Sequence, residues 1–99
     1  MFNIDNCPFC GDPEMIIENE LAFAHYDSYP LNDGHCLIIP RRHFAEYFEA
    51  TAAEKAAIWE LLDEVKPIID REFRPDGYNV GVNIGSAAGQ SIPHLHIHV

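Results

Sequence analysis

The chain has 99 residues, of which 47% are hydrophobic and 22% charged. This composition is typical of one small globular domain with a modest core, not of a disordered chain. Six basic residues against sixteen acidic ones give a formal charge of -10, which argues against binding to a DNA or RNA duplex or to an anionic membrane. A small anionic ligand stays compatible, because backbone N–H groups and imidazoles can bind an anion locally.

The first ten residues, MFNIDNCPFC, contain no basic segment followed by an apolar stretch, so no secretory signal is predicted. No apolar run approaches the ~20 residues that a membrane-spanning helix needs. Two of the three cysteines form the close pair Cys7 and Cys10. In a chain without an export signal such a pair indicates metal or redox chemistry before a structural disulfide. We therefore expect a cytoplasmic location.

Turn-forming residues dominate positions 1–14, and we expect irregular chain there. Short strands are predicted at 15–17 and 21–27. A loop at 29–34 follows, and a buried strand at 35–39 ends before Pro40.

One long helix is predicted after the third strand. Thr51 and Glu54 have the spacing of a capping box, and apolar residues then recur at helical spacing from Ala57 to Ile69. Pro67 lies inside this pattern and predicts a kink or an irregular turn there, and the turn residues at 74–77 end the helix.

Three further segments complete the chain. Residues 78–83 alternate as a strand, 85–91 form a loop of small residues, and 94–99 form a last strand. Five short strands and one helix predict an α+β fold, with a helix on one face of an antiparallel sheet, in a single domain over 1–99.

The last strand places three histidines on one face, because successive side chains point to opposite sides. His94, His96 and His98 alternate with apolar residues that can be buried. The imidazoles would then line a surface or a cleft. Three unrelated histidines fit this pattern poorly, because His favours neither strands nor cores.

Two kinds of chemistry fit the histidine row. Two neighbours can share a zinc ion, but His94 and His98 are separated by ~13 Å along a strand, so a site using all three would be strained. A neutral imidazole can instead act as a nucleophile. The small residues from Gly85 to Ser91 allow backbone N–H groups to approach an anion, which favours a phosphate substrate and nucleophilic catalysis.

The run from Gly89 to Val99 resembles the signature of the histidine-triad (HIT) family. The segments Leu21-Ala22-Phe23, Asp27, Pro30, Gly34-His35 and Ile39-Pro40 fall where that family has its nucleotide-pocket strands. The resemblance implies an α+β fold with a five-stranded antiparallel sheet, one long helix and a short helical segment. It also implies a homodimer in which two such sheets join.

The resemblance further implies hydrolysis or transfer at the α-phosphate of adenylylated substrates, such as dinucleoside polyphosphates, through a covalent nucleotidyl-histidine. This chemistry needs no metal. The catalytic residues implied are His96 as nucleophile, His98 and His35 to orient it, and Gln90 and Ser91 at the phosphate and leaving group. The nucleotide-binding residues implied are Asp27 at the ribose, Asn83 at the phosphate, and Gly89, Gln90 and Ser91.

Taken alone, several of these residues have simpler interpretations. Asp27 could start a turn, His35 could end a strand, and Asn83 and Gln90 could cap loops. His25 is interpreted only as a strand residue near the pocket rim, and Cys36 as buried packing.

A structural zinc is implied separately, because some family members complete the cysteine pair with two histidines. Here the four ligands would be Cys7, Cys10, His43 and His94. A redox-active pair is the alternative, although no thioredoxin-like turn follows it.

The chain stops at Val99, directly after the histidines, whereas family members usually continue with a tail. We therefore expect the usual C-terminal tail to be missing, which leaves substrate choice open. A purine nucleotide or adenylylated small molecule is the expected partner. The alternatives are a nucleoside phosphoramidase, a non-catalytic nucleotide-binding module, and a metal-dependent hydrolase that uses the histidine row.

Overall fold

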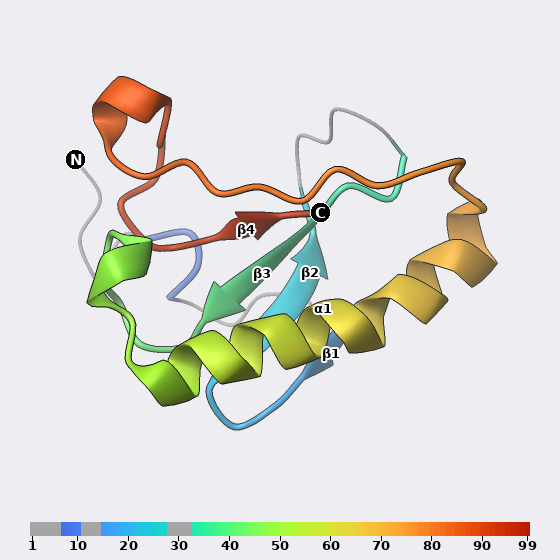
Figure 1. Cartoon of the computed structure of the whole chain (residues 1–99), viewed down its shortest axis with the longest axis horizontal. Helices are drawn as coiled ribbons and strands as arrows, with labels where there is room; N and C mark the ends of the chain where they lie inside the picture. Colours follow the sequence, from blue (N-terminus) through green and yellow to red (C-terminus); the bar gives the residue numbers. More distant parts are fainter. Residues whose placement is uncertain (1–6, 11–14, 28–32) are drawn as a thin grey trace.

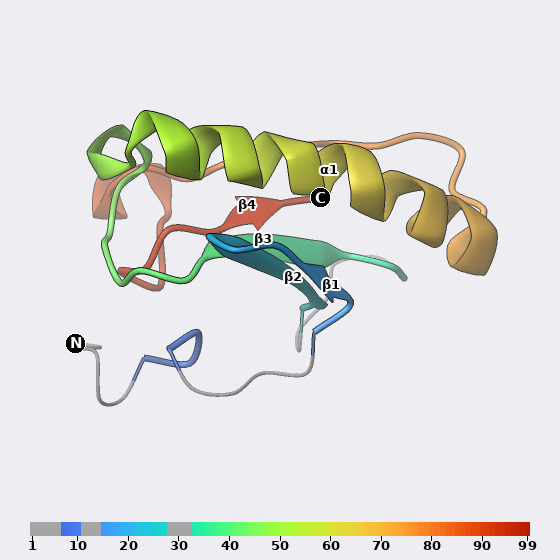
Figure 2. The ribbon, with the colours of Figure 1, turned by 90° about the horizontal axis from the view of Figure 1, so that it is seen from below.

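The computed structural model describes residues 7–10, 15–27 and 33–99. Four strands form an antiparallel sheet in the order β1-β2-β3-β4, and one long helix lies on one of its faces (Figures 1 and 2). The strands are β1 Ile17–Glu18, β2 Ala22–Tyr26, β3 Cys36–Pro40 and β4 Ile97–His98. The helices are η1 Tyr47–Glu49, α1 Ala52–Phe73 and η2 Ser86–Ala88. The expected α+β fold with one long helix is confirmed.

The strand register sorts the side chains onto two faces. Ala24 pairs with Ile38, which pairs with Ile97, and all three are buried in the core beneath α1. His25 pairs with Leu37, which pairs with His98. Because neighbours across a sheet share a face, this second row lies on the face away from α1. The segment 7–10 also lies on that side (Figure 2).

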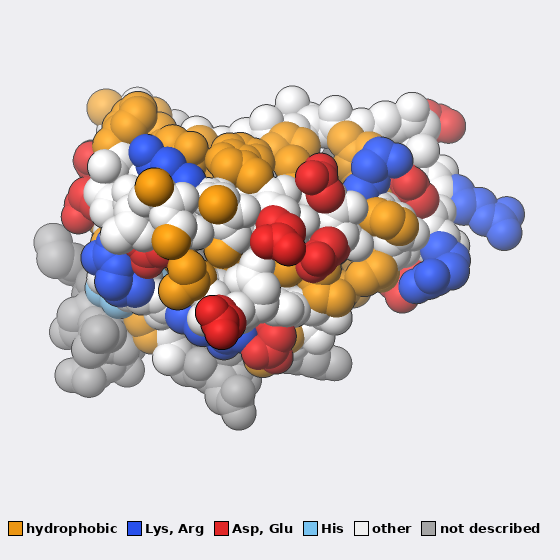
Figure 3. Space-filling model, turned by 60° about the horizontal axis from the view of Figure 1, so that its bottom comes forward, with side chains coloured by type: hydrophobic (Ala, Val, Ile, Leu, Met, Phe, Trp, Pro, Cys, Tyr) orange, Lys and Arg blue, Asp and Glu red, His pale blue; other side chains and the backbone are white. Residues whose placement is uncertain are grey.

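Helix α1 holds the sheet through one apolar stripe. Its buried residues include Ile58, Leu61 and Val65, each 0% exposed, and Ile69. Burying one such aliphatic side chain contributes about 1.5–3 kcal/mol. The outer face carries most of the charged side chains, and Figure 3 shows acidic side chains gathered over the middle of this side of the molecule, among exposed hydrophobic ones. The amphipathic pattern therefore fixes which side of α1 meets the sheet.

Both ends of α1 agree with the sequence. The Thr51 hydroxyl accepts a hydrogen bond from the Glu54 backbone N–H at 3.1 Å, and the Glu54 carboxylate accepts one from the Thr51 N–H at 2.9 Å. This is the predicted capping box. The helix continues past Pro67 and ends at Arg74, which adopts a left-handed conformation. Within the described residues, no helix is long and apolar enough to cross a membrane.

The sheet is smaller than the sequence predicts. In the described chain the expected strand at 78–83 makes a single bridge, in which Gly81 and His98 exchange backbone hydrogen bonds of 3.0 and 2.8 Å. The last strand is limited to Ile97–His98, because the Leu95 N–H bonds instead to the Phe44 carbonyl at 2.8 Å. Alternation predicts which face a residue takes, but not whether a neighbouring strand completes the ladder.

Candidate active site and metal centre

The three histidines of the C-terminal segment lie close to one another but differ in exposure. His94 is 0% and His96 is 5% exposed, while His98 is half-buried. His94 and His96 are thus covered in this structure, and only His98 is partly open to solvent. The cause is the segment 7–10, whose Phe9 ring lies 5.8 Å from the His94 ring and 5.2 Å from the His96 ring, centre to centre.

The ring of His96 is held by the main chain next to it. Its Nδ1 lies 2.8 Å from the backbone carbonyl oxygen of His94, so Nδ1 carries the proton and donates it. The other ring nitrogen, Nε2, then keeps its lone pair. Burial lowers the pKa of His96, while the hydrogen bond to His94 and the charge of Asp27 act in the opposite direction. The imidazole is therefore neutral near pH 7.

Three polar side chains, those of Asp27, His35 and His98, lie in a row beside His96. Nδ1 of His98 lies 3.1 Å from Nε2 of His35, and Nδ1 of His35 lies 3.7 Å from the Asp27 carboxylate. The rings of His98 and His96 are 5.0 Å apart. Burial, followed by the charges of His96 and His35, lowers the pKa of His98. The structure thus brings together Asp27, His35 and His98, which come from three different segments.

A compact group of metal-binding side chains lies at the other end of the histidine row. One ligand atom from each of Cys7, Cys10, His43 and His94 lies within 4.8 Å of the others. Nδ1 of His94 is 3.4 Å from Cys7 Sγ and 3.3 Å from Cys10 Sγ, and Nδ1 of His43 is 3.0 Å from Cys10 Sγ. Ligands at about 2.0–2.3 Å around a tetrahedral zinc would be only slightly further apart.

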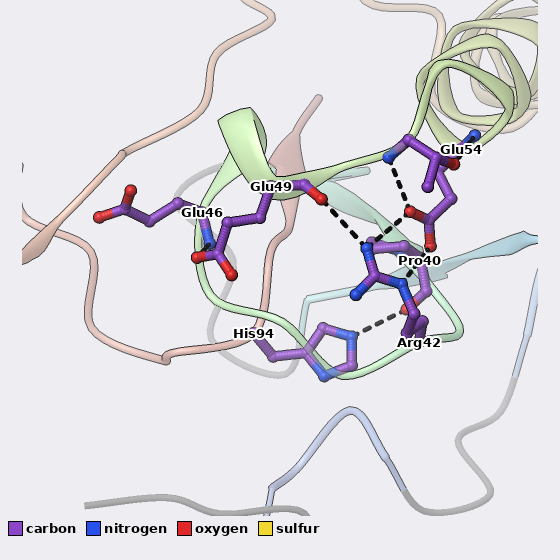
Figure 4. Close-up of polar contacts among 7 residues, drawn as sticks. Pro40, Arg42, Glu46, Glu49, Glu54 and His94 are labelled. Carbon is purple, nitrogen blue, oxygen red and sulfur yellow. Dashed lines mark hydrogen bonds and ion pairs between the residues drawn. The ribbon is translucent and has the colours of Figure 1, made fainter.

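The hydrogen bond of the second ring nitrogen of His94 also agrees with a role as a metal ligand. Its Nε2 lies 2.8 Å from the backbone carbonyl oxygen of Pro40 (Figure 4). Donation from Nε2–H leaves Nδ1 as the lone-pair nitrogen, and Nδ1 is the atom that faces the two cysteines. Metal-bound histidines usually have such a partner for the second nitrogen. Burial and Cys7 raise the pKa of Cys10 to about 11, whereas a reactive redox thiol needs a lowered one.

An ion pair secures the turn that carries His43. Arg42 donates to both carboxylate oxygens of Glu54 at 2.9 and 3.1 Å, and to the Glu49 carbonyl at 3.1 Å (Figure 4). Arg42 and the backbone N–H of Thr51 lower the pKa of the Glu54 carboxyl, although burial acts against them. Glu54 thus ties the start of α1 to the chain leaving β3.

The loop before the histidines is braced by the two amides that the sequence singled out. Gln90 accepts from the Gly85 N–H at 2.8 Å and donates to the carbonyls of Ala45 and Ile92 at 2.7 and 3.0 Å. Asn83 donates to the Ala88 carbonyl at 2.7 Å. Gly89 has φ +89, a conformation that favours glycine. Ser91 is exposed.

Two residues of this face were not predicted to matter. Phe9 packs against the histidine row, as described above. His25 has an Nε2 that is buried and, among the described residues, without a hydrogen-bond partner. Its position two residues before Asp27, within the strand predicted at 21–27, was the available signal, because i and i+2 share a face.

One cavity of the described structure lies away from His94 and His96. It has about 410 Å³ and lies between the end of α1 and Val99, with His35 and Gly34 in its wall. Gly34 has φ +84, and a Cβ there would come within 2.9 Å of Phe73. Of Asp27, His35 and His98, only His35 is among the residues that line this cavity.

Comparison with known proteins identifies the family. The HIT domain sequence model matches residues 11–99. The chain is 38% identical over 101 residues to an uncharacterized 16.1 kDa HIT-like protein of Mycoplasma pneumoniae, covering 96% of this chain and 70% of that one. It is 35% identical over 95 residues to an AP-4-A phosphorylase of Mycobacterium tuberculosis, covering 93% of this chain but only 49% of that protein. A solved Zn-bound histidine triad family protein from Mycobacterium smegmatis matches with TM-score 0.85 and 28% identity, covering 98% of this chain and 75% of that one. The chain belongs to the HIT domain family.

Proposed function

We propose that the chain is a nucleotidyl hydrolase or transferase that cleaves adenylylated compounds, such as dinucleoside polyphosphates, at the α-phosphate. The observation that carries the proposal is the hydrogen bond from His96 Nδ1 to the His94 carbonyl. It leaves Nε2 of a neutral imidazole as a nucleophile. The relative named AP-4-A phosphorylase supports an adenylylated substrate.

In the first step, Nε2 of His96 attacks the α-phosphorus. A P–N bond forms, and the bond from phosphorus to the leaving oxygen breaks. His98 supplies the proton that the leaving group takes up. Its contact with Nε2 of His35 orients its ring, and the charge of Asp27 acts in favour of its protonated form. Water then attacks the phosphorus and gives its proton to His98, the P–N bond breaks, and His96 is restored. An acceptor such as phosphate in place of water makes the same reaction a transfer.

The nucleotide would lie across this face of the sheet. We assign Asp27 to the ribose hydroxyls, and Asn83, Gly89 and Ser91 to the phosphate. Gln90 acts in this proposal by fixing the loop, since its amide already bonds to three backbone groups. A braced loop keeps its N–H groups directed at the anion without reorganisation during the reaction.

Zinc is proposed as a structural ion, with Cys7, Cys10, His43 and His94 as its ligands. The support is the donor set, the close approach of the four ligand atoms and the second-nitrogen contact of His94. The Zn-bound relative of known structure supports the choice of metal. The ion would tie the N-terminal segment to β3 and to the histidine row, and no step of the chemistry passes through it.

We also propose a homodimer. Several apolar side chains are exposed, among them Phe48 at 73% and Trp59 and Val80 at 39% each. In the described chain, Val80 belongs to the 78–83 segment that makes only one bridge to the sheet. Such a segment can pair with another strand. Sedimentation analysis that finds a monomer at micromolar concentration would rule the dimer out.

Turnover tests the proposed function. The zinc-replete protein should release AMP from diadenosine tetraphosphate, and His96→Ala should lose at least about a thousandfold in rate, as expected for a lost nucleophile. Glu60→Gln, an exposed change on α1, is the matched control. A parallel assay with adenosine 5′-phosphoramidate decides between anhydride and P–N cleavage. A protein that binds AMP but turns over neither substrate is a binding module, which contradicts the proposal.

A further inference from the structure

His25 holds a buried polar atom that the described fold does not satisfy. Its Nε2 has no hydrogen-bond partner among the described residues, and the rings beside it are those of Phe9 and Phe23, at 6.0 and 6.1 Å between centres. A buried nitrogen without a partner is unfavourable and needs an explanation. The flanking rings are apolar, so they do not supply one.

The position of His25 relates it to the proposed nucleotide site. His25 lies on β2, and Asp27 directly follows this strand, where its N–H still bonds to the His35 carbonyl at 2.9 Å. With the alternation continued by one residue, the two side chains share a face and are about 6.6–7 Å apart. Across the sheet, His25 pairs with Leu37, and Leu37 with His98. Two strand spacings of about 4.8 Å therefore separate His25 from His98. If the phosphate lies at the histidine row and the ribose at Asp27, the base would lie against His25.

The chemistry of the ring fixes what Nε2 can bind. The ring interacts with the backbone of Tyr26, which raises the pKa of His25, while burial, the larger effect, lowers it. The imidazole is therefore neutral. We assign the single proton of the neutral ring to Nδ1, the nitrogen nearer the main chain, which leaves Nε2 with its lone pair. Nε2 is then a hydrogen-bond acceptor, and its natural ligand is an N–H donor.

We propose that His25 is a base-selecting residue, whose Nε2 accepts a hydrogen bond from the exocyclic amino group of adenine. The inference rests on the proposed function. Phe9, which lies on a short turn outside the strands, packs beside His25, and its ring would have to shift for the base to reach Nε2. The bound base then supplies the donor that the fold lacks. A purine with an oxygen at the same position would place an acceptor against the lone pair.

The test removes the amino group from the ligand. Calorimetry with the zinc-replete chain compares AMP with purine riboside 5′-monophosphate, which has hydrogen in place of that group, and with IMP. A neutral hydrogen bond predicts that AMP binds about 3 to 10 times more tightly than the purine analogue, and IMP should bind most weakly. These three ligands need no variant, so the test does not depend on how a mutant folds.

Variants test whether His25 is the residue that recognises the amino group. His25→Leu should bring the AMP-to-analogue ratio close to one, and His25→Gln, whose amide oxygen can accept, should restore part of it. Tyr26→Phe, a neighbour whose side chain points to the other face, should keep the full ratio. Equal binding of AMP and the analogue by the unaltered chain overturns the inference, as does an unchanged ratio in folded His25→Leu. Failure of the folded chain to bind AMP at all overturns the nucleotide site itself, and the proposed function with it.

Discussion

The Nδ1–H of His96 donates a hydrogen bond to the backbone carbonyl oxygen of His94, 2.8 Å away. The side chain of His94 belongs to the cysteine–histidine cluster, while its carbonyl orients the neighbouring imidazole. One residue therefore joins the proposed metal centre to the proposed nucleophile. The imidazole of His94 faces the cysteines, whereas its backbone carbonyl faces His96. The two histidines can therefore take different roles.

Removal of one cysteine tests the metal centre. Cys10→Ser should lose bound zinc and lower the thermal midpoint, because the ion links the N-terminal segment to the rest of the fold. Metal content by mass spectrometry should be one zinc per chain in the unaltered protein and near zero in the variant. Cys36→Ala changes a buried cysteine outside the cluster, and it should keep its zinc. Full zinc occupancy in Cys10→Ser would contradict the assignment of the ligands.

The Phe9 ring should stabilise the histidine face by packing. It is 6% exposed, and Phe9→Ala should cost about 3–4 kcal/mol of unfolding free energy, as buried Phe-to-Ala changes do. Phe9→Leu should cost much less, since it keeps most of the apolar contact. Urea denaturation measures both, and zinc content should be retained in both. Equal stabilities of the two variants would show that the ring does not pack as described.

The Glu54 carboxylate should make stability depend on pH. Its pKa in the folded protein lies below the ordinary value of 4.5, so its contribution is fully present above pH 4.5 and is lost as the pH falls through the lower folded value. Glu54→Gln should therefore destabilise the protein at pH 7 by about 1–2 kcal/mol. The difference from the unaltered protein should shrink below pH 4.

Urea denaturation at several pH values measures this difference. Glu60→Gln, at an exposed position of the same helix, is the control and should follow the unaltered protein at each pH. A constant difference between Glu54→Gln and the unaltered protein from pH 7 to pH 3 would contradict the account.

Local signals in the sequence were sufficient for much of the fold. The capping box of Thr51 and Glu54 and the apolar spacing that follows predicted the long helix, because both depend on contacts three or four residues apart. Alternation predicted that the three histidines share a face. The cluster of Cys7, Cys10, His43 and His94 followed from the family resemblance, and the structure brings these four residues together.

Features that depend on distant contacts could not be predicted in this way. The strand expected at 78–83 shrinks to one bridge at Gly81, because strand pairing depends on a partner that the local pattern does not specify. The burial of His96 depends on Phe9, which is far away in the sequence. His25 had no predicted role, because the missing partner of its Nε2 is visible only once the neighbouring strands are in place.

The central claim is that His96 forms a covalent bond to the nucleotide. Intact-protein mass spectrometry after a brief acid quench with diadenosine tetraphosphate tests it most directly, with His96→Ala as the matched variant. The account predicts a transient mass increase of one AMP in the unaltered protein and none in the variant. Release of AMP without any adduct, or the same adduct in His96→Ala, would contradict it.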